Sequence, residues 1–207
     1  MADDADRYEF VTRWELDATP EEVFSILEEA TALPRWWPSV YLEVTEVDAG
    51  GADGVGRVVS FFTKGWAPYT LRWSARVLSA TRPTHLELEA FGDLRGRGVW
   101  AIEAKPPGCV VTYTWAVSAE KPLLKSLSFA LKPFFAANHE WAMARGLESL
   151  KLELRRRRAE TADERAKVPA PPAPTPRTGM PLLLGAVGVV SAVAGAATLW
   201  RRRPRDF

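Results

Sequence analysis

The 207-residue sequence predicts an α+β fold that combines an antiparallel sheet, one long helix after it, and a membrane-spanning helix near the C-terminus. Three observations lead to this prediction. Between residues 41 and 118, apolar and polar side chains alternate in short runs separated by turn residues, as in an antiparallel meander. Residues 121–158 then carry an apolar stripe at helical spacing. Residues 178–200 contain no charged side chain over 23 positions, and a bilayer core of ~30 Å needs about 20 such residues.

The N-terminal part predicts a strand followed by two short helical segments. Residues 8–16 alternate as a strand does. Thr19 is a helix cap, Pro20 suits the first helical position, and the carboxylates that follow suit the first turn, so a short helix begins at Pro20. A second short turn from Ala30 ends at the Pro34-to-Pro38 segment, because residues before proline avoid the helical region.

The middle of the chain predicts a meander whose strands have one apolar and one charged face. Glycine and proline clusters separate the strands, which are Tyr41–Val47, Arg57–Lys64, Tyr69–Leu78, His85–Phe91, Leu94–Ala104 and Val110–Ser118. Alternation places these residues on the apolar face: Leu71, Trp73, Ala75, Val77, Leu86, Leu88, Ala90, Trp100, Ile102, Val111, Tyr113, Trp115 and Val117. The opposite face carries Arg72, Arg76, Glu87, Glu89, Arg95 and Arg97, which we interpret as solvated cross-strand pairs.

A long helical segment follows from Lys121, with Pro133 expected to kink or split it. Its apolar stripe, which should lie on the sheet, consists of Ala136, His139, Met143, Gly146, Leu147, Leu150 and Leu154. Phe134, Trp141 and Leu152 lie nearly opposite, so one buried face does not explain them. Contact with the two short helices or with a partner would cover them.

The chain therefore divides into a globular domain (residues 1–158), a proline-rich linker (159–180), a transmembrane helix (181–200) and a basic tail (201–207). At about 3.1 Å per extended residue, the linker would let the domain stand roughly 60 to 70 Å from the bilayer.

Charge is distributed unevenly along the chain. Residues 1–150 carry 15 Lys or Arg and 21 Asp or Glu, whereas residues 151–207 carry 12 and 5. An acidic domain is a poor partner for phosphate backbones, which argues against nucleic-acid binding, while a basic stalk suits an anionic leaflet.

Cys109 is the only cysteine, so no intrachain disulfide forms, and the first 13 residues lack the apolar core of a secretory signal. We expect the domain to stay on the cytoplasmic side.

Several segments together resemble a known superfamily. They are Trp14 to Phe24, Leu33 to Pro38, Gly54-Val-Gly56, Gly92 to Gly98 and Asn138 to Met143, and they span about residues 8 to 155. In order and spacing they resemble the START-like superfamily (SRPBCC), in its polyketide cyclase/dehydrase and lipid transport branch. The resemblance implies a helix-grip fold, in which the sheet curls round the C-terminal helix and leaves a cavity used for lipids, polyketides, sterols and other apolar molecules. Members include both carriers and enzymes, so a shared fold is no proof of a shared reaction.

Within that cavity we expect aromatic walls and one histidine. Two adjacent indoles, Trp36 and Trp37, cannot both point into one core, so we expect one of them to cover the cavity; the alternative is that both are structural. His139 could move a proton near neutral pH together with Tyr113, or it could be an ordinary core histidine. The aromatic walls could equally be plain core. The expected cavity residues are Trp36, Trp37, Trp73, Leu88, Trp100, Tyr113, Trp115, His139 and Met143.

No cofactor or metal site is expected. His85 lies on the solvent side of its strand, and the sequence lacks the spacing of paired His or Cys ligands that zinc needs. Gly92, Gly96 and Gly98 lie between two strands with no helix after them, so they mark a turn and bulges in the sheet rather than a phosphate loop.

The C-terminal span gives conflicting orientation signals. Four Arg follow it within five residues, which alone would place the C-terminus inside, whereas moving seven residues across the bilayer is easier than moving a folded domain. We therefore favour a single-pass C-terminal anchor with the domain in the cytoplasm. Gly188, Ala192 and Ala196 repeat every four residues and would let two spans pack together; lipid-facing small residues are the alternative.

Three functions remain open from the sequence. The first is a membrane-tethered protein that binds or carries a hydrophobic small molecule, such as a lipid or polyketide. The second is a polyketide cyclase, aromatase or dehydratase that uses His139 and Tyr113. The third is a non-enzymatic membrane interaction module that docks a partner through Phe134 and Trp141.

Overall fold

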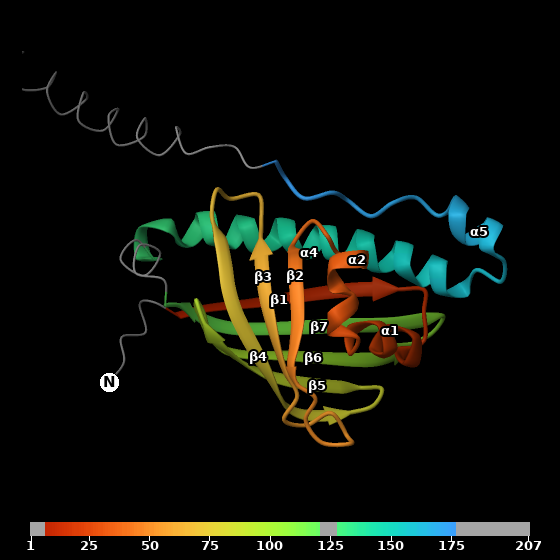
Figure 1. The fold of residues 1–207 in the computed structure, drawn as a ribbon, viewed down its shortest axis with the longest axis horizontal. Coiled ribbons are helices and arrows are strands. Elements are labelled where there is room, and N and C mark those ends of the chain that lie inside the picture. The colour runs from red at the N-terminus through yellow and green to blue at the C-terminus, as the bar shows by residue number, and fades with distance from the viewer. Residues whose placement is uncertain (1–6, 121–127, 177–207) are drawn as a thin grey trace, which may run out of the picture. The chain divides into compact units, whose positions relative to one another are not determined.

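The computed structural model describes residues 7–120 and 128–176 (Figure 1). They form seven strands, a long helix and several short helices. In chain order these are β1 (Arg7–Leu16), α1 (Pro20–Leu27), η2 (Ala30–Ala32), α2 (Leu33–Trp36), β2 (Tyr41–Asp48), β3 (Val58–Lys64), β4 (Thr70–Thr81), β5 (His85–Gly92), β6 (Leu94–Lys105), β7 (Gly108–Ala119), α4 (Ser128–Arg158) and α5 (Ala162–Lys167).

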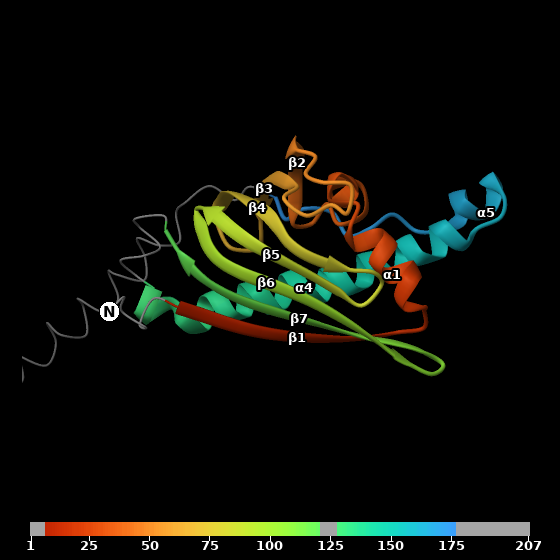
Figure 2. The ribbon, with the colours of Figure 1, turned by 90° about the horizontal axis from the view of Figure 1, so that it is seen from below.

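The strands form one antiparallel sheet in the order β1-β7-β6-β5-β4-β3-β2. The sheet is curved, and α4 runs along it with its contacts to the sheet mainly at β1 (Figures 1 and 2). Helix α1 packs on α4 and β6, and α2 packs on α4 and β2. This is the α+β helix-grip arrangement that the resemblance implied.

The predicted faces of the sheet are confirmed by its register. Trp100 is opposite Tyr113 and Leu88 is opposite Gly98, so the apolar positions of neighbouring strands share one side. On the other side, Arg97 pairs with Glu87 at 2.8 Å and Arg76 with Glu89 at 3.9 Å. Four of the six charged residues therefore form the predicted cross-strand pairs, whereas the Arg72 guanidinium lies 4.1 Å from the centroid of the Phe62 ring.

The glycines of the β5–β6 hairpin give the sheet room for large side chains. A Cβ on Gly98 would lie 2.8 Å from the ring of Trp115, and one on Gly96 would lie 2.1 Å from the carbonyl oxygen of Ala116. Gly96 also has a φ of 153°, which side-chain-bearing residues rarely adopt. These glycines allow close packing within the sheet, and no helix follows them.

Helix α1 begins where the sequence predicted. The Thr19 hydroxyl accepts a hydrogen bond from the Glu22 amide at 3.2 Å, and the Glu22 carboxylate accepts one from the Thr19 amide at 2.8 Å. This capping box satisfies two of the backbone donors that every helix start leaves open.

Helix α4 buries the predicted apolar stripe and one charged group. Met143, Leu150 and Leu154 are buried. Glu153 is also buried, with a side chain only 2% exposed, and its carboxylate accepts two hydrogen bonds of 2.8 Å from Arg35 and one of 3.1 Å from Arg157. The bidentate Arg35 pair ties α2 to the C-terminal half of α4.

Of the three apolar residues opposite the stripe, Phe134 has an aromatic partner in the β3–β4 loop. Its ring meets Trp66 edge-on at 4.9 Å between centroids. Trp141 has the Arg145 guanidinium 5.9 Å from its ring centroid, and both Trp141 and Leu152 are half-buried.

The first part of the linker is not the free extended tether that we expected. Residues 162–167 form helix α5, which Thr161 caps. The described residues up to Thr175, α5 included, belong to one compact unit. The proline-rich residues 168–175, here called the strap, are held at both ends. The Arg156 guanidinium donates to the Pro169 carbonyl.

At the other end of the strap, Lys64 Nζ donates to the Thr175 carbonyl at 2.7 Å, and the Thr175 hydroxyl donates to the Gly65 carbonyl at 3.0 Å. Extended proline-rich backbone makes no internal hydrogen bonds, so its carbonyls are free to accept from side chains of the domain. The composition that predicted a loose linker therefore also suits a docked one.

The transmembrane helix (181–200), the basic tail (201–207) and the repeat at Gly188, Ala192 and Ala196 lie outside the described residues. Among residues 7–120 and 128–176, no helix has the length and apolar character needed to cross a bilayer.

Candidate functional site: a divided cavity between the sheet and helix α4

Two neighbouring cavities lie on the apolar side of the sheet. Cavity 1, of about 160 Å³, lies beneath the N-terminal half of α4, and cavity 2, of about 140 Å³, lies beside α1 and α2. Four aromatic residues, which we call the shared wall, line both: Trp37, Tyr41, Trp73 and Tyr113.

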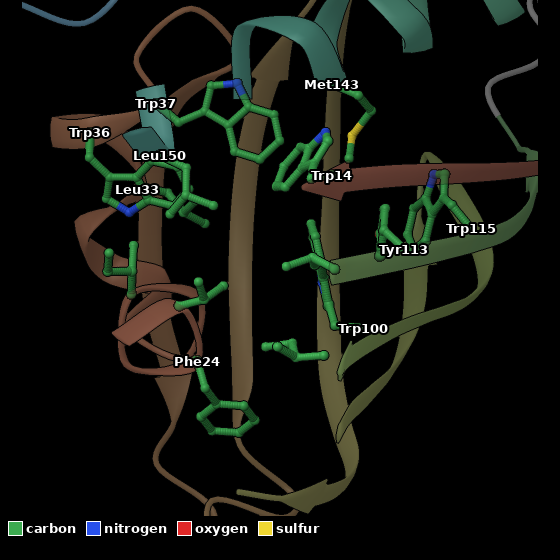
Figure 3. Close-up of a cluster of buried hydrophobic side chains, with 14 of the residues drawn as sticks. Trp14, Phe24, Leu33, Trp36, Trp37, Trp100, Tyr113, Trp115, Met143 and Leu150 are labelled. Carbon is green, nitrogen blue, oxygen red and sulfur yellow. The ribbon is translucent and has the colours of Figure 1, made fainter. Parts of the chain in front are cut away.

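Cavity 1 is mainly apolar, with a few polar groups on one side. Strands β4 and β7 contribute Trp73, Tyr113 and Trp115, and α4 contributes His139 and Met143. Figure 3 shows Tyr113 and Trp115 on the sheet, with Met143 descending from α4. Such a cavity, with apolar walls and a small number of polar groups, is typical of small-molecule sites.

The expectation that Trp36 and Trp37 cannot both point into one core was wrong, because both are buried in the same hydrophobic core, with ring centroids 5.5 Å apart. Trp36 ends helix α2, is fully buried (0% exposed) and lines neither cavity, so its assignment to the cavity wall was wrong. Trp37 leaves the helical conformation (φ −128°, ψ 53°), which turns its indole toward both cavities. A Cβ on Gly146 would lie 2.3 Å from the Trp37 ring, so this glycine gives the indole its place against α4.

The other predicted cavity residues all line one cavity or both. His139, Met143 and Trp115 line cavity 1, Leu88 and Trp100 line cavity 2, and the remaining three belong to the shared wall. Sequence alternation had placed them on one face but gave no sign that the space beneath α4 and α1 is divided.

His139 is a neutral polar group in cavity 1. Its Nε2 lies 3.4 Å from the Thr12 hydroxyl, and its ring stacks on Phe10 with centroids 4.3 Å apart. Burial lowers the pKa of His139 from 6.5 to about 4, because the charged imidazolium loses hydration there. At neutral pH the imidazole is therefore uncharged and a weak base, which suits hydrogen bonding to a ligand better than proton transfer.

Tyr113 is held by stacking rather than by hydrogen bonds. Its ring stacks on Trp100 with centroids 3.9 Å apart and an interplanar angle of 18°. Burial, and next the nearby Tyr41, raise the pKa of Tyr113 well above 10. Burial likewise raises the pKa of Tyr41. Both phenols are therefore protonated at neutral pH and are hydrogen-bond donors.

Several cavity residues were missed from the sequence, and Asn138 is the clearest case. Its side-chain oxygen accepts a hydrogen bond from the Ala67 amide at 3.1 Å, and its side-chain nitrogen lies 3.4 Å from the Tyr69 hydroxyl. A Cβ on Gly65 would be 2.1 Å from the Asn138 oxygen. Asn138 thus fastens the β3–β4 loop to α4 beside cavity 1, a contact between residues 71 positions apart that no local pattern reveals.

Charged groups near cavity 2 are paired with one another. Arg82 forms an ion pair with Glu28. Arg57 donates to the Glu28 carbonyl at 2.8 Å and pairs with Glu46 at 2.9 Å. These contacts link the end of α1 to the β2–β3 end of the sheet. Through them, Arg57, Arg82 and Glu28 each have a partner of opposite charge.

Within the described part of the chain, no three His, Cys, Asp or Glu side chains gather in a way that could hold a metal ion. Cys109 is buried, and burial raises the pKa of its thiol. It is placed as a structural side chain.

Similar solved structures share the fold. TTHA0849 from Thermus thermophilus superposes with a TM-score of 0.59 at 16% identity, covering 73% of this chain and 100% of that one. Zhui aromatase/cyclase from Streptomyces sp. R1128 gives a TM-score of 0.58 at 14% identity, covering 75% and 98%. The di-domain ARO/CYC BexL from the BE-7585A biosynthetic pathway gives 0.56 at 14% identity, covering 71% of this chain and 50% of that one.

Identities this low establish a common fold and leave the reaction open. No curated protein matches the chain. The family model described as polyketide cyclase / dehydrase and lipid transport, however, matches residues 7–155, which is most of the chain. The chain therefore belongs to this family.

Proposed function

We propose that this protein binds a hydrophobic small molecule in the space between the sheet and helix α4. The observation that carries the proposal is the pair of adjoining aromatic-walled cavities, because a well-packed core leaves few voids larger than a water molecule. The volumes of about 160 and 140 Å³ add up to about 300 Å³, the lower end of the range for small-molecule sites.

The polar groups of cavity 1 suit binding better than catalysis. His139 is neutral and weakly basic, and the phenol of Tyr113 is protonated, so neither is tuned to exchange a proton near neutral pH. They would instead orient a ligand by hydrogen bonds. A carrier or binding protein is therefore the leading function.

The test is binding of cis-parinaric acid, a fluorescent fatty acid, to the full-length protein in lipid nanodiscs, followed by energy transfer from tryptophan. Ala142 lines cavity 1 on α4, whereas Ala144, two positions on, is exposed. Ala142→Trp should weaken binding at least tenfold by filling the cavity, and Ala144→Trp should leave it unchanged. Absence of binding by the unmodified protein, or equal binding by both variants, would contradict the proposal.

A second candidate function is a cyclase or aromatase. It is favoured by the likeness to two structures named as aromatase/cyclases and by the position of Tyr113 between the cavities. If the protein is such an enzyme, His139→Gln would abolish turnover of a poly-β-ketone substrate while its binding persists. Turnover that survives this substitution would leave only the binding function.

We also propose that residues 181–200 tether the domain to a membrane on the cytoplasmic side. The uncharged stretch and the basic residues around it support this. The strap restricts where the chain leaves the domain, because Thr175 is hydrogen-bonded to Lys64 and Gly65, both of which line cavity 1.

Apolar ligands dissolve in a bilayer, so a membrane tether would raise their concentration around the domain. Sedimentation with vesicles of phosphatidylcholine and phosphatidylglycerol tests membrane attachment, and protease accessibility in intact cells tests the side. Protein that stays in the supernatant would overturn the membrane attachment. A domain that protease cleaves from outside intact cells would overturn its cytoplasmic location.

A further inference from the structure

Strand β1 lies at one edge of the sheet and is paired with a strand on one side only. Its register with β7 is unbroken from Arg7 to Leu16. Figure 2 shows β1 at the border of the sheet, next to β7. Among the described residues, only β7 forms hydrogen bonds with the backbone of residues 9–15. A long, regular edge strand of this kind is a template for pairing with another strand.

The two faces of β1 have different surroundings. Helix α4 packs on the inner face, where the Phe10 ring stacks on His139 with centroids 4.3 Å apart and the Tyr8 ring meets Phe135 edge-on at 5.6 Å. On the outer face, Val11 is 66% exposed at the middle of the strand. The outer face therefore presents an apolar side chain that no part of the described chain covers.

The odd-numbered positions of β1 form a charge pattern that is complementary to itself. Along the sequence, Arg7, Glu9, Arg13 and Glu15 alternate in sign around Val11. If two copies of β1 pair antiparallel with Val11 opposite Val11, Glu9 comes opposite Arg13 of the second copy, and position 7 comes opposite position 15. By symmetry, each of these pairings occurs twice. Opposite charges directly across two strands stabilise their pairing.

The other edge strand, β2, lacks these features. Its register with β3 is interrupted twice, between Tyr41 and Glu43 and between Glu46 and Asp48. Its charged residues are all acidic, so two copies of β2 would bring like charges together. Irregular register and repelling charge are common protections of an edge strand against pairing. Strand β1 has neither protection.

We propose that the free edge of β1 is a homodimerisation surface, on which two copies of the chain pair antiparallel about a two-fold axis at Val11. The pairing joins the two sheets and brings the exposed Val11 side chains into contact. The inner face of the same strand carries Tyr8 and Phe10, which line cavity 1. The cavities of the two copies would therefore lie on one continuous sheet. This inference goes beyond the proposed ligand binding and does not depend on it.

Cysteine cross-linking of the full-length protein in a mild detergent tests the register. Directly opposite residues of antiparallel strands have Cα atoms about 4.5–5.5 Å apart, within the range that a disulfide spans. Val11→Cys should therefore form an intermolecular disulfide under mild oxidation. Arg13→Cys should not, because this register separates the two copies of position 13 by about 14 Å along the strands.

Two controls complete this experiment. Val47→Cys, at a residue of β2 that is 65% exposed, matches Val11→Cys in exposure and should not form a cross-link. The unmodified protein, whose only cysteine is the buried Cys109, should not form one either.

Charge reversal in the Val11→Cys protein tests what holds the two strands together. Arg13→Glu places a carboxylate opposite Glu9 at two points of the interface. It should raise the protein concentration needed for half-maximal cross-linking about tenfold, because two attractive pairs become repulsive. Adding Glu9→Arg restores opposite charges and should return this concentration to its original value.

Each outcome supports or overturns the dimer. The absence of a Val11→Cys cross-link would overturn it. Similar yields at Val11→Cys, Arg13→Cys and Val47→Cys would also overturn it, since contact driven by another part of the chain, such as residues 181–200, has no preference for Val11. A charge reversal that Glu9→Arg does not rescue would contradict the proposed register. Binding of cis-parinaric acid is measured separately, so loss of the dimer and loss of the ligand site are distinguished.

Discussion

Gly146 on α4 offers the sharpest test of how the cavity wall is held. A Cβ at this position would lie 2.3 Å from one carbon of the Trp37 ring and 2.6 Å from another. Ordinary contact starts at 3.4 Å, so Gly146→Ala must displace the ring by about 1 Å. Trp37 has little room to move, because it is only 3% exposed and packs against Trp36 and Trp14 at centroid distances of 5.5 and 6.1 Å.

Two opposing effects set the size of the change in stability. Alanine in place of glycine favours a helix by about 1 kcal/mol. Overpacking a rigid core costs about 1–3 kcal/mol, and the fixed rings around Trp37 put this case at the upper end. We therefore expect Gly146→Ala to lower the free energy of unfolding by about 2 kcal/mol, which for a domain of this size lowers the melting temperature by roughly 4–8 °C.

Urea unfolding of the full-length protein in nanodiscs, followed by circular dichroism, measures this change. Ala144→Gly, at an exposed position of the same helix, is the matched control and should cost about 1 kcal/mol through helix propensity alone. Because Trp37 belongs to the shared wall, Gly146→Ala should also weaken cis-parinaric acid binding. A variant that is more stable than the original protein would refute the reasoning, since it would mean that the Trp37 ring yields freely.

Three further predictions address charge and the strap. Burial lowers the pKa of His139 from 6.5 to about 4, so between these pH values the unfolded chain binds a proton that the folded protein does not. The free energy of unfolding should therefore fall by up to about 3 kcal/mol as the pH drops from about 6.5 to about 4. His139→Gln should remove this part of the decline, as measured by urea unfolding at each pH. Arg35→Met leaves the buried Glu153 carboxylate with Arg157 at 3.1 Å and Arg156 at 3.9 Å and should cost about 2–3 kcal/mol, because the two bonds from Arg35 are lost. Arg145→Met, at the exposed pair with Glu148, should cost at most about 0.5 kcal/mol, and equal losses would contradict the importance of burial. The double variant Lys64→Met, Thr175→Val removes both hydrogen bonds at the end of the strap. A nitroxide label attached to a cysteine introduced by Ala173→Cys should then become more mobile in electron paramagnetic resonance spectra. An unchanged spectrum would mean that these bonds do not hold the strap.

The strands could be predicted because alternation is a local property. Each strand of the meander buries one face, so Trp100 and Tyr113 were placed on the same side before their register was known, and Thr19 with Pro20 marked the start of α1. The cap and the alternation depend only on residues a few positions apart.

The division of the cavity could not be predicted because it depends on distant contacts. Tyr41 begins β2, where nothing in the local sequence marks it as lining both cavities, and Asn138 meets Ala67 across 71 positions. Trp36 was misassigned for a related reason: both adjacent indoles enter the core, and only the backbone turn at Trp37 decides which of them also faces the cavity.

The strap changes what the C-terminal segment can contribute to function. A free linker would let the domain take any orientation above a membrane, so the tether would only raise the local concentration of ligand. A strap bonded at Lys64 and Gly65 makes the chain leave the domain beside the loop that also carries Trp66, which is 40% exposed and packs on Phe134. Lys64 and Gly65 line cavity 1, so the strap ends on two residues of the proposed ligand site. Ligand exchange would then depend on the strap, and the variant Lys64→Met with Thr175→Val should slow the transfer of cis-parinaric acid from vesicles to the protein without changing its affinity at equilibrium.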